Sequence, residues 1–254
     1  MKKLLFLFLL LSIAVPAFAK DIKNGEDLIA AMHSRYAGKW YKTLTFVQKT
    51  TTYKPDGTTG VETWYEAMSL PGSLRIDIDP LDKGNGILFT GGKVHSFRDG
   101  MLAGGRPFVH PLMVLGFDVY GQPVATTIEQ VKGIGIDLST IHEEKWQGRD
   151  VYVVGAKQGD LTVPQVWVDK KNLYFVRLFE PVGREKKNVQ EVQFNKYQKV
   201  KGGWVAPEVV FFVDGRKTIL EEYTDIQGDV DLHADLWNPE KWMTADRNYF
   251  KIKK

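Results

Sequence analysis

The stretch Leu74-Arg75-Ile76-Asp77-Ile78 alternates strictly between apolar and charged residues. A period of two is typical of a β-strand with one buried and one polar face. We therefore expect Leu74, Ile76 and Ile78 to face a core. We expect Arg75 and Asp77, like the nearby carboxylate of Asp79, to face water.

Strand-like segments continue along the chain from this stretch and come in pairs joined by turn residues. Residues 44–48 lead through Asp56-Gly57 to residues 61–68, and residues 87–89 turn at Gly91-Gly92 into residues 94–98. Further candidates are residues 151–156, 165–168, 174–179, 189–198, 209–213 and 218–223. Such a series predicts an antiparallel meander, and a sheet of this width has to twist and curl. We expect a mainly β (α+β) chain, an incomplete antiparallel β-barrel of about 10–11 strands with helices plugging its concave face.

Two segments without alternation are available to fill that face. Asn24 can cap a helix that ends near Gly38, with Leu28, Ile29, Met32 and Tyr36 along one stripe. Residues 101–138 are apolar and rich in glycine and proline, and Pro111 suits the first turn of a short helix. This second segment is either a lid over a cavity or fixed cover for the sheet. The candidate lid residues are Leu112, Met113, Leu115 and Phe117.

The N-terminus predicts export. Lys2 and Lys3 precede an apolar run over residues 4–15, and Ala17-Phe18-Ala19 fits a signal-peptidase site. We expect residues 1–19 to be removed and residues 20–254 to form a single domain in the periplasm. The chain contains no cysteine, so disulfide bonds and thiolate metal sites are excluded.

The charge of the chain argues against nucleic acid as a partner. Without Lys2 and Lys3 the 34 basic residues fall to 32, against 31 acidic residues. Nucleic-acid binding needs a concentrated positive field, which a nearly neutral chain does not provide. We expect a monomer that binds no nucleic acid.

A search for catalytic motifs favours a protein that is not an enzyme and needs no cofactor. The chain has no nucleophile elbow, P-loop, zinc-protease helix or dinucleotide-binding glycine pattern. Asp231, His233 and Asp235 could place three metal ligands on one side of an extended segment, so a metal-dependent enzyme is a less favoured alternative. Asp77 and Asp79 could act as paired carboxylates, but their alternation with apolar residues favours a solvated face.

Aromatic residues favour an apolar interior large enough to contain a cavity. Several lie within the expected strands, namely Phe46, Trp64, Phe89, Phe97, Trp167 and Phe175. Core packing explains any one of them. The set, taken with the apolar segment over residues 101–138, leans towards a ligand cavity.

Three motifs follow one another along the first part of the chain: Phe46 with Gln48 on the first strand, residues 71–76 (PGSLRI) and residues 87–93 (ILFTGGK). They resemble motifs of a known family, the periplasmic outer-membrane lipoprotein carriers and their LolA/LolB-like relatives. The resemblance runs from about residue 21 to residue 98 and returns as a strand pattern from residue 151 to residue 242, where Asn238-Pro239 is similar to the ending of many relatives.

The resemblance implies an incomplete barrel with helices as a lid, which shelters acyl chains of a lipid or lipoprotein between a membrane-bound donor and a membrane-bound acceptor. A similar module in regulatory proteins of envelope stress binds lipid-like ligands, which gives a sensor as the alternative. The cavity residues that the resemblance and the strand pattern imply are Phe46, Trp64, Met68, Leu70, Leu74, Ile76, Ile78, Phe89 and Phe97.

One position departs from the family pattern. The lipoprotein carriers place an arginine just before the Pro-Asn or Pro-Gly turn, where it fastens the lid, and Leu70 stands there in this chain. Glu66 is the nearest polar residue on the same strand face. The polar fastening is therefore either missing or supplied by another residue. The absence of the arginine favours a closed state that rests on apolar contact.

Overall fold

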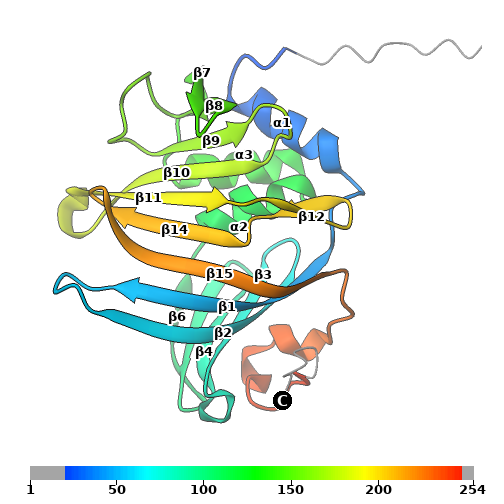
Figure 1. The fold of residues 1–254 in the computed structure, drawn as a ribbon. Coiled ribbons are helices and arrows are strands. Elements are labelled where there is room, and N and C mark those ends of the chain that lie inside the picture. The colour runs from blue at the N-terminus through cyan, green and yellow to red at the C-terminus, as the bar shows by residue number, and fades with distance from the viewer. Residues whose placement is uncertain (1–20, 248–254) are drawn as a thin grey trace, which may run out of the picture.

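A computed structural model of the chain describes residues 21–247, so the expected signal peptide lies outside the described residues. The described chain forms one open antiparallel sheet of thirteen strands and one two-stranded hairpin (Figure 1). The strand order in the large sheet is β6-β5-β4-β3-β2-β1-β15-β14-β11-β10-β9-β8-β7. Because β1 pairs with β15, the first and last strands meet near the middle of the sheet, and β6 and β7 are its edges.

The expected meanders are confirmed on both sides of this central pair. The first half contains β1 (Thr43–Tyr53), β2 (Thr59–Ser69), β3 (Ser73–Ile78), β4 (Asn85–Thr90), β5 (Lys93–Arg98) and β6 (Met101–Pro107). The second half contains β7 (Ile141–Trp146), β8 (Arg149–Val154), β9 (Gln165–Asp169), β10 (Phe175–Val182), β11 (Asn188–Asn195), β14 (Glu208–Val213) and β15 (Arg216–Gly228). The separate hairpin joins β12 (Gln198–Val200) and β13 (Gly203–Val205).

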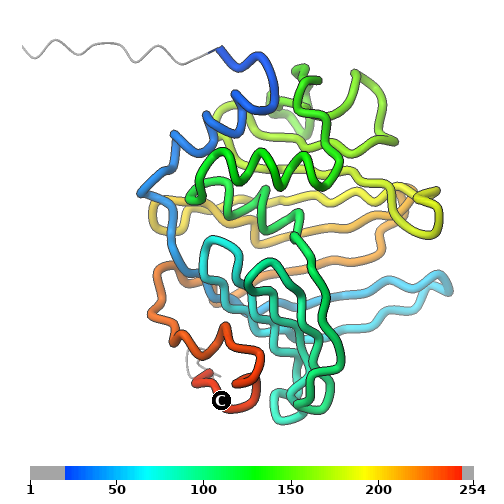
Figure 2. Tube along the Cα trace, turned by 180° about the vertical axis from the view of Figure 1, so that it is seen from behind, coloured from blue at the N-terminus to red at the C-terminus, as the bar shows by residue number. Residues whose placement is uncertain are grey.

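Helices cover one face of the sheet, as Figure 2 shows from behind. They are α1 (Gly25–Tyr36), α2 (Pro111–Gly116), the 3-10 turn η2 (Asp118–Tyr120) and α3 (Val124–Gly133). Asn24 caps α1 as expected, because its side chain accepts a hydrogen bond of 2.8 Å from the Asp27 amide. The main hydrophobic core lies between these helices and the concave face.

Aromatic contacts anchor the helical layer at one end. The Trp40 ring, just after α1, stacks on the Tyr120 ring of η2 at a centroid distance of 3.7 Å. The Tyr120 hydroxyl accepts a hydrogen bond of 3.1 Å from the Phe175 amide of β10. Tyr120 is fully buried, so η2 is fixed to both α1 and the sheet.

The charged face of β3 is buried, which corrects the expectation that it faces water. Arg75 and Asp77 are buried beneath the segment that contains η4 (Ala234–Trp237) and η5 (Pro239–Lys241), whereas Asp79 is exposed. The Arg75 guanidinium donates to Asp77 at 2.7 Å and lies 3.8 Å from the centroid of the Trp242 ring. Arg247 also donates to Asp77, at 3.1 Å. Alternation identifies the charged face of a strand but not what a distant segment places on it.

Two edge strands escaped the sequence analysis. All residues of β6 are exposed, and β7 alternates only weakly between partly buried and exposed residues. An edge strand without a clear buried face lacks the alternation that identifies a strand. Among the described residues, no helix has both the length and the apolarity required to cross a membrane.

Candidate functional site

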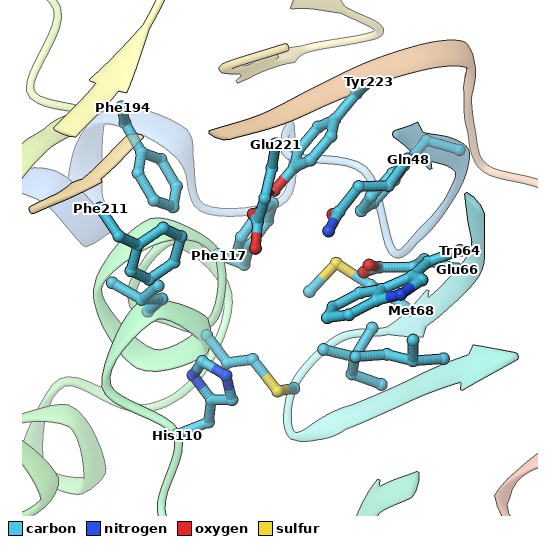
Figure 3. A pocket seen from close by; sticks show the side chains of 15 residues that line it. Gln48, Trp64, Glu66, Met68, His110, Phe117, Phe194, Phe211, Glu221 and Tyr223 are labelled. Carbon is cyan, nitrogen blue, oxygen red and sulfur yellow. Dashed lines mark hydrogen bonds between the residues drawn. The ribbon is translucent and has the colours of Figure 1, made fainter. Parts of the chain in front are cut away.

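A cavity of about 150 Å³ lies between the concave face of the sheet and α2 (Figure 3). Strands β1, β2, β3, β11, β14 and β15 supply one wall, and α2 with its flanking residues supplies the other. The lining side chains are Phe46, Gln48, Trp64, Glu66, Met68, Leu74, Ile76, His110, Leu112, Met113, Phe117, Phe194, Phe211, Glu221 and Tyr223. Most of the lining is apolar, as a site for an apolar ligand requires.

The predicted cavity residues divide into three groups. Five line the cavity: Phe46, Trp64, Met68, Leu74 and Ile76. Three others pack in the main core around it: Leu70, Ile78 and Phe89. That these residues bind a ligand stays a prediction.

The placement of Phe97 in the cavity is wrong. Phe97 pairs with Gly86, which pairs with Asp77, so it shares the buried charged face of β3 rather than the concave face. Its ring stacks on Trp242 at a centroid distance of 4.1 Å, in a small cluster separate from the main core.

The predicted lid residues lie at α2. Leu112, Met113 and Phe117 line the cavity, while Leu115 is buried in the main core and does not line it. Gly116 allows α2 to approach β11 closely, because a Cβ there would lie 3.1 Å from the Phe194 ring.

A second cavity of about 80 Å³ lies on the other side of α2. Gly72, Phe89 and Phe108 contribute to its lining, and His110 and Met113 line both cavities. The start of α2 therefore forms the partition between the two spaces.

Polar side chains gather on one wall of the larger cavity. Glu66 of β2 and Glu221 of β15 both point into it, as Figure 3 shows. The Tyr223 hydroxyl donates a hydrogen bond of 3.0 Å to Glu221, and the Gln48 amide donates one of 2.8 Å to the Thr50 hydroxyl. No described residue donates a hydrogen bond to the Glu66 carboxyl, although Glu66 is only 5% exposed.

Burial changes the acidity of these groups. It raises the pKa of Glu66 well above its ordinary value, and the nearby charge of Glu221 raises this pKa further. Burial also raises the pKa of Glu221 from 4.5 to about 7, against the lowering effect of the hydrogen bond from Tyr223. For His110 burial lowers the pKa to about 4, so its ring is neutral at pH 7.

Solved structures that share this architecture include proteins of three bacteria. An outer membrane lipoprotein-sorting protein domain from Vibrio parahaemolyticus superposes with a TM-score of 0.58 at 13% identity, over 86% of this chain and 97% of that one. A LolA superfamily protein from Nitrosomonas europaea gives a TM-score of 0.50 at 14% identity, over 87% of this chain and 99% of that one. The chain has a LolA-like fold.

A DUF1329 family protein from Desulfovibrio piger also shares this fold. It superposes with a TM-score of 0.56 at 15% identity, over 84% of this chain and 95% of that one. At these identities the likeness concerns the fold alone. No protein-family profile matches the chain, and no curated protein matches it either.

A hydrogen bond ties η2, which follows α2, to the turn between β2 and β3, so of the two alternatives left open by Leu70 the structure supports a polar contact supplied by another residue. The Asp118 carboxylate of η2 accepts a hydrogen bond of 3.0 Å from the Gly72 amide, in the turn between β2 and β3. Asp118 is 3% exposed, and burial raises the pKa of its carboxyl to about 6. Leu70 itself packs against the main core, and Glu66 plays no part in this contact.

The cavity residues expected from the sequence did not include its polar ones, although Gln48 and Glu66 were noted for other reasons. Gln48 and Glu66 occupy the apolar phase of their strands, beside Phe46 and Met68, and a polar residue in that phase is a detectable signal. Glu221 offered no such signal, because β15 reads RKTILEEYTDIQG and lacks clear alternation.

The candidate metal ligands do not form a site. Asp235 accepts a hydrogen bond of 2.8 Å from the Lys241 ammonium and lies 3.7 Å from the His233 ring. Across residues 21–247, no three histidine, aspartate or glutamate side chains lie together as metal ligands would. The structure gives the metal-enzyme alternative no support at Asp231, His233 and Asp235.

Proposed function

We propose that the chain is a periplasmic carrier that shelters the acyl chains of a lipid or lipoprotein and delivers them towards the outer membrane. The observation that supports this proposal is the mainly apolar cavity between the concave face of the sheet and α2. An acyl chain cannot cross an aqueous compartment exposed, since each buried CH₂ group is worth about 0.8 kcal/mol. A cavity of this kind supplies the burial.

The size of the cavity requires α2 to move when cargo enters. A volume of about 150 Å³ is comparable with engineered cavities that admit a benzene-sized ligand, which is smaller than a full acyl chain. Displacement of His110 and Met113 would join this cavity to the neighbouring one of about 80 Å³. We therefore propose that Leu112, Met113 and Phe117 act as a lid, with Asp118 and Gly72 as its fastening.

The proposed role carries expectations about partners and place. The carrier takes its cargo from a membrane-bound donor and passes it to a membrane-bound acceptor, and it works as a monomer without a cofactor. Cleavage after Ala19 would release it into the periplasm, starting at Lys20. In this proposal the protein is not an enzyme, because its cavity encloses an acyl chain and does not carry out a reaction on it.

Lipid analysis of the native protein tests the proposal. The full chain is expressed in a Gram-negative host, purified from the periplasm without detergent, and extracted for mass spectrometry. We expect acyl lipids at a defined ratio to protein, and we expect them to be lost from the Leu74→Glu variant but kept by Val61→Glu, a matched control at an exposed position of β2. Absence of acyl lipid from folded wild-type protein would contradict the proposal.

A further inference from the structure

The polar wall of the larger cavity is built by three neighbouring strands, β2, β1 and β15. Glu66 of β2 pairs with Phe46 of β1, and Glu221 of β15 pairs with Thr50 of β1. Gln48 lies between these two positions on β1 and pairs with Tyr223. The two glutamates therefore come from opposite sides of β1, at positions four residues apart along it, and both line the cavity (Figure 3). They are near enough for the charge of Glu221 to raise the pKa of Glu66.

Glu66 is left without a partner inside the protein. It is 5% exposed, and within residues 21–247 no hydrogen bond or ion pair reaches its carboxyl group. A buried polar group without a partner costs stability, so its presence calls for an explanation other than packing. Glu66 points into the cavity, so a ligand there could reach it.

A second buried group faces the same cavity without a partner. The Nδ1 atom of His110 is inaccessible to solvent and has no hydrogen-bond partner among the described residues. His110 lies at the start of α2, on the side of the cavity opposite the two glutamates. A ligand that displaces the start of α2 would therefore reach a second unsatisfied group, on the wall opposite the glutamates.

The charges around the cavity are of one sign. Neither lysine nor arginine occurs among the described lining residues, whereas two carboxyl groups do. Aromatic rings surround them: Phe46 stacks on Tyr223 at a centroid distance of 4.2 Å, and Trp64 lies beside Glu66 in Figure 3. The faces of such rings attract cations. An anionic carboxylate or phosphate would find no lysine or arginine to pair with in this lining and would be repelled by each carboxyl group that is ionised.

We propose that the carrier cavity binds a cationic amphiphile, with an ammonium group between Glu66 and Glu221 and an apolar chain against Phe117, Phe194 and Phe211. This inference rests on the proposed carrier function and adds the chemical class of the cargo. A positive charge between the two carboxyl groups favours their ionised forms, which opposes the effect of burial on their pKa values.

Three ten-carbon probes that differ only in their head group test the inference. Decylamine, decanol and decanoate are titrated at pH 7.5, below their aggregation concentrations, into the full-length mature protein, and binding is followed by calorimetry. Charge-assisted hydrogen bonds of about 1.5–3 kcal/mol correspond to about tenfold or more in affinity. We expect decylamine to bind at least about tenfold more tightly than decanol, and decanoate most weakly.

The double variant Glu66→Gln/Glu221→Gln removes the charges and keeps the shape of the wall. We expect it to lose the preference for decylamine while its affinity for decanol stays unchanged, which also shows that the cavity is intact. Glu222→Gln is the matched control, because Glu222 is next in sequence but pairs with Lys49 at 3.4 Å on the other face of the sheet.

The outcomes of these titrations distinguish failure of the ammonium site from failure of the proposed carrier function. Equal binding of decylamine and decanol to wild-type protein, or a preference that survives in the double variant, would overturn the ammonium site and leave the carrier in place. Failure of all three probes to bind would overturn both proposals. Loss of the preference in the double variant but not in Glu222→Gln supports the site.

Discussion

The two faces of the sheet at β2 and β3 bury acidic side chains in opposite ways. On the face under the C-terminal segment, Asp77 accepts hydrogen bonds from both Arg75 and Arg247. On the concave face, Glu66 receives none from the described residues. A buried charge paired within the protein secures the fold, whereas one that points unpaired into a cavity is available to a ligand. We infer that the first face is structural and the second functional.

The largest effect is expected on the paired face. Arg75→Met leaves Asp77 buried with only Arg247 as a partner, and loss of one member of a buried ion pair costs about 3–5 kcal/mol. Urea unfolding followed by circular dichroism measures this loss. Arg98→Met, at an exposed position of β5, should change the free energy of unfolding by less than about 0.5 kcal/mol. Similar small effects for both variants would show that the pairing of Arg75 is not structural.

An effect of opposite sign is expected on the cavity face. The folded pKa of Glu221 is about 7 against an ordinary 4.5, so the folded state holds the proton more tightly than the unfolded state. The contribution of Glu221 to the free energy of unfolding is therefore fully present below pH 4.5 and is lost as the pH rises to 7. The glutamine of Glu221→Gln cannot ionise, but it can still accept a hydrogen bond from the Tyr223 hydroxyl. The free energy of unfolding of this variant, relative to that of wild type, should therefore rise by up to about 3 kcal/mol between pH 4.5 and pH 7.

Unfolding of both proteins at several pH values measures this difference. Asp118 and His110 titrate in the same range, with pKa values of about 6 and about 4, but both residues are common to the two proteins and cancel in the comparison. Glu66 does not cancel, because the charge of Glu221 raises its pKa, so both proteins carry Glu66→Gln in this comparison. A stability difference that does not change between pH 4.5 and pH 8 would contradict the account of Glu221.

A smaller effect is expected at the lid. Amides of residues 114–117 should exchange with solvent faster than those of β3, because α2 is short and opens for cargo in the proposed function. Asp118→Asn weakens the charge-assisted bond from the Gly72 amide, worth about 1.5 kcal/mol, and should speed this exchange about tenfold. Exchange measured by mass spectrometry checks both statements. If residues 114–117 exchange as slowly as β3 in wild type and variant, the segment is fixed core.

Much of the fold could be predicted because its signals are local. The Asn24 cap needs only Asp27, three residues away, and each hairpin of the meander needs only its own turn and alternation. The burial of Arg75 could not be predicted in this way, because it depends on Trp242, which lies far along the chain.

The candidate cavity was predictable only in part. Leu74 and Ile76 follow from the strand pattern, and Glu66 stands out as a polar residue among apolar ones. Glu221 comes from a strand without clear alternation and joins the cavity only because β15 pairs with β1 across the sheet. Pairing between strands that lie far apart in the chain cannot be predicted from the local sequence.

The central claim is that the concave cavity binds an apolar chain, and binding of a fluorescent acyl probe with an uncharged head group to three proteins tests it most directly. The proteins are wild type, Leu74→Glu, which places a carboxylate in the cavity wall, and Val61→Glu, which places one on the exposed surface of β2. Thermal unfolding confirms that each is folded, and Leu74→Phe, which fills part of the cavity, replaces Leu74→Glu if that variant does not fold. The account predicts that wild type and Val61→Glu bind the probe and that the Leu74 variant loses at least about tenfold in affinity. Equal affinity for all three folded proteins would contradict it.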